Sequence, residues 1–167
     1  MTQPQSANLI TYSNDFSNAY WNKTGSSVVS GQSSPDGLTN AFKLITDNGT
    51  LLTSGFLQAE PDIIASTYTF SGFLKIEEFN RASIYVRNAA AGGDNVNAIF
   101  DLDTGTLVSL TDAGLLTGIS TNITPFINGF YRCSVTFSSS SIMTLRARFL
   151  CSDDTETLGD GTSGIYI

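Results

Sequence analysis

Five basic side chains occupy alternate positions of segments whose intervening positions are apolar. They are Lys75, Arg87, Arg132, Arg146 and Arg148, and Tyr85 shares their phase. Residues two apart point to the same face of a β-strand, so Arg146 and Arg148 are expected to project together. Arginine binds carboxylates through paired hydrogen bonds, and arginine and aromatic residues are enriched at interfaces. If these strands are neighbours in one sheet, they form a basic surface that binds an acidic protein surface or a charged glycan.

The same six residues have a second interpretation. Basic side chains on strands also pair with acidic residues across the sheet, and they protect exposed strand edges from pairing with other chains. The sequence leaves both interpretations open.

Catalytic chemistry has few candidates in this chain. It contains no histidine, which excludes Ser-His-Asp and Cys-His nucleophiles and the commonest metal ligand. A glycosidase needs two carboxylic acids that flank a sugar, but most acidic residues here fall in expected turns, where aspartate bonds the local backbone. These residues are Asp36, Asp47, Asp94, Asp103, Asp112, Asp153, Asp154 and Asp160. We expect no enzymatic activity.

Acidic residues near two of the expected turns could in principle supply oxygen ligands for calcium. They are Asp101, Asp103, Asp153, Asp154, Glu156 and Asp160. Their spacing does not match an EF-hand loop, and solvated turns explain them more simply. We expect neither a metal nor a cofactor.

The overall charge limits the class of partner. Eight Lys and Arg against fifteen Asp and Glu give a net charge of −7, the wrong sign for neutralising nucleic-acid phosphates. No apolar stretch approaches the roughly 20 residues that span a bilayer. Met1 to Leu9 has neither the basic start nor the apolar run of a secretory signal. Nucleic acid and membrane are therefore not expected as partners, and export by that route is not expected.

The elements that position the basic residues are predicted to be β-strands. From Phe130 to Phe137, apolar residues alternate with polar ones, and Asn128-Gly129 supplies a turn just before. Met143 to Cys151, Tyr68 to Lys75 and Ile84 to Arg87 repeat the alternation. Further strands are predicted at Leu9 to Tyr12, Ser26 to Ser30, Ala41 to Asp47, Leu51 to Leu57, Asn97 to Leu102, Thr106 to Leu110, Ile119 to Phe126 and Gly164 to Ile167. Roughly ten to twelve strands, with Asp103-Thr104-Gly105 as a hairpin turn, predict an all-β antiparallel β-sandwich.

Cysteine and tryptophan are assigned to the core of this sandwich. Cys133 and Cys151 fall at the apolar phase of their segments and could face each other across neighbouring strands, although two cysteines are too few for a disulfide scaffold. We predict buried thiols, with a disulfide as the less favoured alternative. Trp21 could stack on a sugar ring, but we expect it in a core cluster with Tyr12, Phe16 and Phe42.

Four stretches together resemble a known family. They are NLITYSNDFSNAYW (Asn8 to Trp21), FDLDTGTL (Phe100 to Leu107), NGFYRCSVTF (Asn128 to Phe137) and GDGTSGIYI (Gly159 to Ile167). Their order and content resemble the carbohydrate-binding-module-like jelly rolls of bacteriophage virion proteins, which occur in tail fibres and on capsid surfaces. The resemblance covers nearly the whole chain and implies a jelly-roll fold.

The resemblance also carries an expectation about function. In such domains the final strand usually continues through a Trp-Gly-Ala-Gln segment, whereas this sequence stops at Ile167. We therefore expect a free-standing form that acts as a capsid decoration or cement protein, binds the major capsid protein or another virion protein, and is located in the virion after assembly in the host cytoplasm. The alternative is a glycan-binding adhesion module of a tail or head fibre that contacts a host surface glycan.

The expected domain organisation is simple. Residues 1–7 are polar and include Pro4, which suits an N-terminal arm or a frayed terminus, and residues 8–167 form one sandwich domain. A homo-oligomer is expected, with a trimer favoured, because weak contacts repeated across a symmetric shell sum to a large stabilisation.

Overall fold

The computed structural model describes residues 7–152 and 157–167, so most of the expected N-terminal arm lies outside the described residues. The described chain forms antiparallel strands and one short 3-10 helix, η1 (Ile127–Gly129). None of its helices is long and apolar enough to cross a membrane. The strands are β1 (Asn22–Thr24), β2 (Ser26–Gln32), β3 (Ala41–Thr46), β4 (Phe56–Ala59), β5 (Asp62–Ile63), β6 (Ser66–Ile76), β7 (Arg81–Asn88), β8 (Asn95–Asp101), β9 (Thr106–Ala113), β10 (Leu116–Pro125), β11 (Tyr131–Ser139), β12 (Met143–Ser152) and β13 (Gly164–Tyr166).

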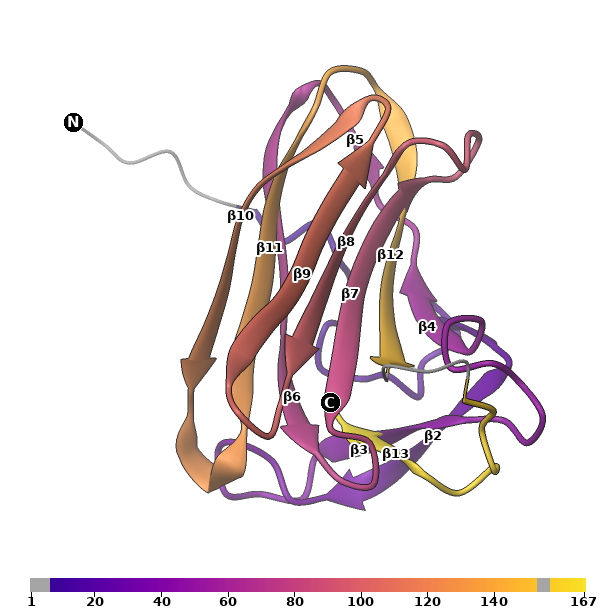
Figure 1. The fold of residues 1–167 in the computed structure, drawn as a ribbon, viewed down its shortest axis with the longest axis vertical. Helices are drawn as coiled ribbons and strands as arrows, with labels where there is room; N and C mark the ends of the chain where they lie inside the picture. Colours follow the sequence, from indigo (N-terminus) through magenta and orange to yellow (C-terminus); the bar gives the residue numbers. More distant parts are fainter. Residues whose placement is uncertain (1–6, 153–156) are drawn as a thin grey trace.

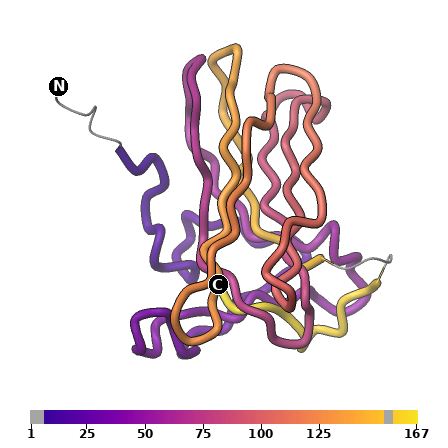
Figure 2. Tube along the Cα trace, turned by 60° about the vertical axis from the view of Figure 1, so that its left-hand side comes forward, coloured from indigo at the N-terminus to yellow at the C-terminus, as the bar shows by residue number. Residues whose placement is uncertain are grey.

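The strands form two layers that face each other across the core (Figures 1 and 2). The strands follow one path in the order β1-β4-β12-β7-β8-β9-β10-β11-β6-β13-β3-β2, with β5 also paired to β12. The front layer contains β4, β12, β7, β8 and β9, and the back layer contains β10, β11 and β6, while β13, β3 and β2 continue the path across the base of the molecule (Figure 1). The two layers are joined where β9 turns into β10, and there only Ala113 and Leu116 are paired. The prediction of an all-β antiparallel sandwich is confirmed.

Period-two alternation places the core as expected. Ile84 and Val86 in β7, and Val135 and Phe137 in β11, are each at most 1% exposed, while their neighbours along each strand point away from the core. Burying each such side chain contributes about 1.5–3 kcal/mol. The two layers therefore share one apolar interior.

An aromatic cluster closes one end of this interior. Trp21 is 3% exposed, its ring centroid lies 4.9 Å from that of Phe16, and Phe16 in turn packs on Phe42 at 5.6 Å. The indole N–H donates a hydrogen bond of 3.0 Å to the Tyr12 carbonyl. The prediction of a core tryptophan is confirmed, but Tyr12 is 53% exposed and does not belong to the buried cluster.

Two strand predictions near the N-terminus of the domain are wrong. Leu9 and Ile10 have no regular secondary structure and a turn begins at Thr11, because the Asn8 side chain accepts the Ile10 N–H and Tyr12 adopts a φ of 57°. Leu51 to Gly55 is also mostly turn, and strand β4 begins only at Phe56. The short strands β1 and β5 were not predicted.

The two cysteines are buried thiols, as predicted, but they are not neighbours. Cys133 lies in β11 of the back layer and Cys151 in β12 of the front layer, and both are free. The expectation that they could face each other across adjacent strands is wrong. Burial raises the pKa of each thiol from 9.0 to about 12.

Candidate ligand-binding site

Strands β12 and β7 bring four of the six expected site residues together on the outer face of the front layer. In their antiparallel register Arg146 lies opposite Arg87, and Arg148 lies opposite Tyr85. The period-two alternation that buries Ala147 and Val86 turns these four side chains outward. We call Arg87, Arg146 and Arg148 the arginine cluster.

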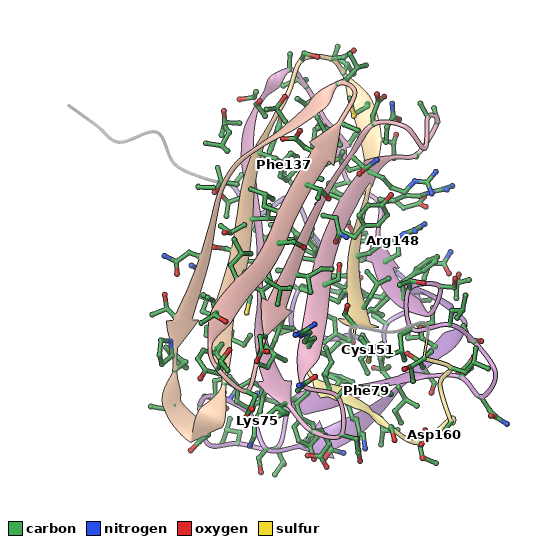
Figure 3. All side chains as sticks on the ribbon, viewed as in Figure 1. Lys75, Phe79, Phe137, Arg148, Cys151 and Asp160 are labelled. Atoms are coloured by element: carbon green, nitrogen blue, oxygen red, sulfur yellow. The ribbon has the colours of Figure 1, made fainter. Side chains whose placement is uncertain are left out.

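Arg148 is the most enclosed member of the cluster and is labelled in Figure 3. It is 9% exposed, and its guanidinium carbon lies 3.7 Å from the ring centroid of Phe56 and 5.8 Å from that of Tyr85. Its Nε–H donates a hydrogen bond of 2.6 Å to the Gln58 side-chain oxygen. Burial lowers the pKa of Arg148 to about 10, and the nearby positive charge of Arg87 acts in the same direction.

A hydrogen-bonded relay links Arg148 to Arg146 through strand β4 and the residue after it. The Gln58 amide donates to Glu60 Oε1 at 2.6 Å, and Arg146 Nε donates to the same oxygen at 3.2 Å. Glu60 therefore supplies one negative charge to a cluster with three positive charges. Arg148 is buried and fixed by its hydrogen bond to Gln58. Arg146 is more accessible to a partner, because 35% of its side chain is exposed.

Arg87 has the least complete set of partners in the cluster. Among the described residues its buried Nε finds no hydrogen-bond acceptor. Its terminal Nη2 lies beside Gly92, where an added Cβ would approach within 2.7 Å. Glycine at position 92 thus leaves room for the Arg87 guanidinium. Asp94 stabilises the β7–β8 hairpin, because its carboxylate accepts hydrogen bonds from the Asn88 side-chain amide at 2.9 Å and from the Leu115 N–H at 3.0 Å.

A groove of about 370 Å³, lined by both polar and apolar side chains, adjoins the cluster on the outer face of β7, β8 and β9. Tyr85 lines the groove and also lies beside Arg148, so it connects the two features. Ser83 donates to Asn97 at 2.5 Å. The other lining residues are Thr53, Asn95, Ile99, Thr111, Leu150, Cys151 and Ser152. Amide and hydroxyl groups beside an aromatic ring can hydrogen-bond and stack on a small polar ligand.

The remaining two expected site residues lie on the back layer. Arg132 in β11 donates to the Ser71 hydroxyl at 3.3 Å and is paired with Phe73 across the strands. The Lys75 ammonium lies 5.6 Å from the ring centroids of both Phe130 and Tyr166; Figure 3 labels Lys75 near the base of the molecule. Strands β8, β9 and β10 separate Arg132 from the arginine cluster along the sheet order. The six residues therefore do not form one continuous basic surface.

Turn formation accounts for the acidic residues considered as calcium ligands, where the structure describes them. Asp101 accepts the backbone N–H groups of Asp103 and Thr104. Asp160 accepts those of Thr162 and Ser163 at 2.8 and 2.6 Å, which holds the pKa of its carboxyl well below the usual range. Asp153, Asp154 and Glu156 lie outside the described residues, and the rest contain no group of three or more metal-ligating side chains.

Sequence reasoning missed the residues that complete the site. Phe56, Gln58 and Glu60 contact the cluster only because β4 pairs with β12 far along the chain, and no local pattern reports that pairing. Asn97 could have been predicted from the sequence, because alternation along β8 points its side chain to the outer face. The structure places it opposite Tyr85. No family model matches the chain, and no curated protein is significantly similar to it.

Proposed function

We propose that the chain is a non-catalytic binding module of a bacteriophage virion, with a carbohydrate-binding-module-like jelly roll as its fold. In this proposal it decorates or cements the capsid by binding an acidic surface of the major capsid protein, after assembly in the host cytoplasm. The four ordered stretches that resemble phage virion domains support the virion assignment. The sandwich architecture is compatible with it.

The observation that carries the proposal is the opposition of Arg87 and Arg146 across β7 and β12. Like charges directly opposite each other destabilise a sheet, and Glu60 neutralises only part of the cluster's charge. A carboxylate from a partner would add a second negative charge beside Arg87 and Arg146 and relieve this repulsion. The free protein thus holds a poorly compensated site that an acidic partner completes.

The proposal is tested by cosedimenting the purified protein with capsids that lack it. We expect saturable binding, and we expect Arg87→Ser to weaken it because this variant removes one of the two opposed positive charges that attract the partner's carboxylate. Arg132→Ser removes the same charge from the back layer and serves as the matched control. Capsid binding that is absent, or that both variants reduce equally, would contradict the proposed site.

A second candidate function is glycan binding in the adjoining groove. It is favoured by the combination of Tyr85, Asn95 and Asn97 around a space of about 370 Å³, which is large enough for about one sugar ring with water. In this case the module would attach the particle to a host surface glycan, as part of a head or tail fibre.

A glycan array with wild-type protein and an Asn97→Ala variant tests the second candidate. Selective binding that the variant loses would support it. Binding that Arg87→Ser loses and Asn97→Ala keeps would instead place recognition on the arginine cluster, with an acidic sugar as its ligand.

A further inference from the structure

The arginine cluster and the adjoining groove lie side by side on the outer face of β7 and β8. Arg87 lies opposite Asn95, and Tyr85 lies opposite Asn97. Paired residues on one face of an antiparallel sheet have Cβ atoms about 4.5–5.5 Å apart, and diagonal neighbours lie about 7–8 Å apart. Arg87 is therefore one diagonal step from Asn97, which lines the groove. A single small ligand can reach both features.

Three side chains around the groove keep hydrogen-bonding groups free for a ligand. The Asn97 side-chain oxygen accepts the Ser83 hydroxyl, so its amide nitrogen still has both donors. Within the part of the chain that the structure describes, the hydroxyls of Tyr85 and Thr111 have no hydrogen-bond partner. These groups line the same space. The groove therefore offers both donors and acceptors to a polar molecule.

The positive charge of the arginine cluster is uncompensated on the side of the groove. Glu60 contacts Arg146 from the β4 side of the cluster, whereas the groove lies on the β8 side. Among the described residues, no carboxylate pairs with Arg87. Asp101, an acid at the end of β8, pairs instead with Arg81 at 3.6 Å. An anionic group bound at the groove would therefore have an unpaired cation beside it.

Two simpler ligands would each use only half of these groups. An acidic peptide side chain brings a carboxylate to Arg87 but leaves the free groups of Asn97 and Thr111 to water. A neutral sugar bonds those groups but supplies no negative charge. We propose that the site binds a sugar that carries a carboxylate, such as a uronic acid residue of an acidic glycan.

In the bound state the sugar ring packs on Tyr85, and its hydroxyls exchange hydrogen bonds with Asn97 and Thr111. The carboxylate accepts charge-assisted hydrogen bonds from the terminal nitrogens of Arg87. Arg146, opposite Arg87, adds a second positive charge. This assignment rests on the second candidate function, glycan binding, and names the class of its ligand.

Calorimetric titration with acidic oligosaccharides and their methyl esters tests the need for the carboxylate. The probes are short oligomers of glucuronate, galacturonate and mannuronate, each compared with its neutral ester of nearly the same size. At least one acid should bind about tenfold or more tighter than its ester, because the ester accepts only weaker hydrogen bonds from Arg87. Absence of binding by every acid, or acids that bind no better than their esters, overturns the proposal.

Three variants locate the binding site of the acid, with far-UV circular dichroism to check that each is folded. Arg87→Gln should lower the affinity for the acid to that of the ester and leave the affinity for the ester unchanged. Asn97→Ala should weaken acid and ester alike, by about threefold to tenfold. Arg132→Gln removes the same charge from the back layer and should change neither. Equal weakening by Arg87→Gln and Arg132→Gln, or no effect of Asn97→Ala, overturns the proposed site.

Capsid cosedimentation of the same proteins separates this proposal from the capsid-binding function. Capsid binding without uronate binding overturns the acidic-sugar ligand and keeps the capsid function. Uronate binding that needs both Arg87 and Asn97, without capsid binding, supports the ligand and overturns the capsid function. Equal binding of acids and esters keeps glycan binding but overturns the need for a carboxylate.

Discussion

Arg87 and Arg146 lie directly opposite each other in the antiparallel pair β7–β12, with the Glu60 carboxylate 3.2 Å from Arg146 Nε. Glu60 also accepts the Gln58 amide at 2.6 Å. The carboxylate therefore holds the relay in place and offsets part of the charge of the arginine cluster. A single carboxylate, that of Glu60, thus stabilises a site that has an excess of positive charge.

Replacing this acid by its neutral isostere should expose the repulsion. We expect Glu60→Gln to lower the free energy of unfolding by about 0.5 kcal/mol at low ionic strength. In about 1 M salt, where the Debye length is about 3 Å, most of the loss should disappear. Urea unfolding at both salt concentrations measures this. Asp103→Asn makes the same charge change in the β8–β9 turn, and a similar salt-dependent loss there would contradict the explanation.

Arg148 and Gln58 should behave as a coupled pair. Arg148→Leu leaves the buried Gln58 oxygen without its 2.6 Å donor, so we expect a loss of about 1–3 kcal/mol in the free energy of unfolding. Arg148→Leu combined with Gln58→Leu replaces both partners by apolar groups and should recover a large part of that loss. A double-mutant cycle by urea unfolding measures the coupling, and strictly additive changes would argue against it.

The buried thiols make the protein sensitive to alkaline pH. The pKa of Cys133 and of Cys151 is raised to about 12 in the folded chain. Above about pH 9 the unfolded chain loses thiol protons that the folded chain keeps, so stability falls as pH rises, by up to about 1.4 kcal/mol per pH unit for each thiol. The clearest window ends near pH 10, where tyrosine side chains also begin to titrate.

Unfolding measurements between pH 8 and pH 10 check this sign. Cys133→Ala should make the decline with pH shallower, whatever its effect on stability at neutral pH. An unchanged slope in this variant would show that other groups cause the decline.

The strands that were predicted correctly are those in which alternation alone sets the buried face. In β11 the polar residues Arg132 and Thr136 alternate with Val135 and Phe137, and the structure buries the apolar set as expected. The incorrect predictions have local polar causes. At residues 8–12 the Asn8 side chain bonds the backbone two residues on, and such bonds compete with strand pairing.

The candidate site was only partly predictable because strand order is a long-range property. Alternation places Arg146 and Arg148 on one face, but it does not say that β7 lies next to β12 or that β11 lies in the other layer. The contact of Gln58 with Arg148 spans 90 residues of chain. Sequence therefore supplied the residue types of the site, whereas the pairing of strands decided which of them meet.

Gly72 and Phe149 form a close contact between the two layers that should not tolerate a larger residue. Gly72 follows the buried phase of β6, and an added Cβ would lie 2.7 Å from the Phe149 ring. Phe149 is 2% exposed and packs on Phe70 at a centroid distance of 4.7 Å, so the ring has little room to move. We expect Gly72→Ala to lower the free energy of unfolding by about 1–3 kcal/mol through overpacking.

Thermal or urea unfolding of two further variants separates this clash from a general effect of replacing glycine. Gly93→Ala adds the same methyl group where nothing lies within 4 Å, and it should cost little. Phe149→Leu introduced into the Gly72→Ala protein removes ring atoms that meet the new methyl, so the second substitution should cost less there than in wild type. Equal costs in both backgrounds would mean that the ring relaxes freely and that the two layers are less tightly packed at this point than the 2.7 Å approach implies.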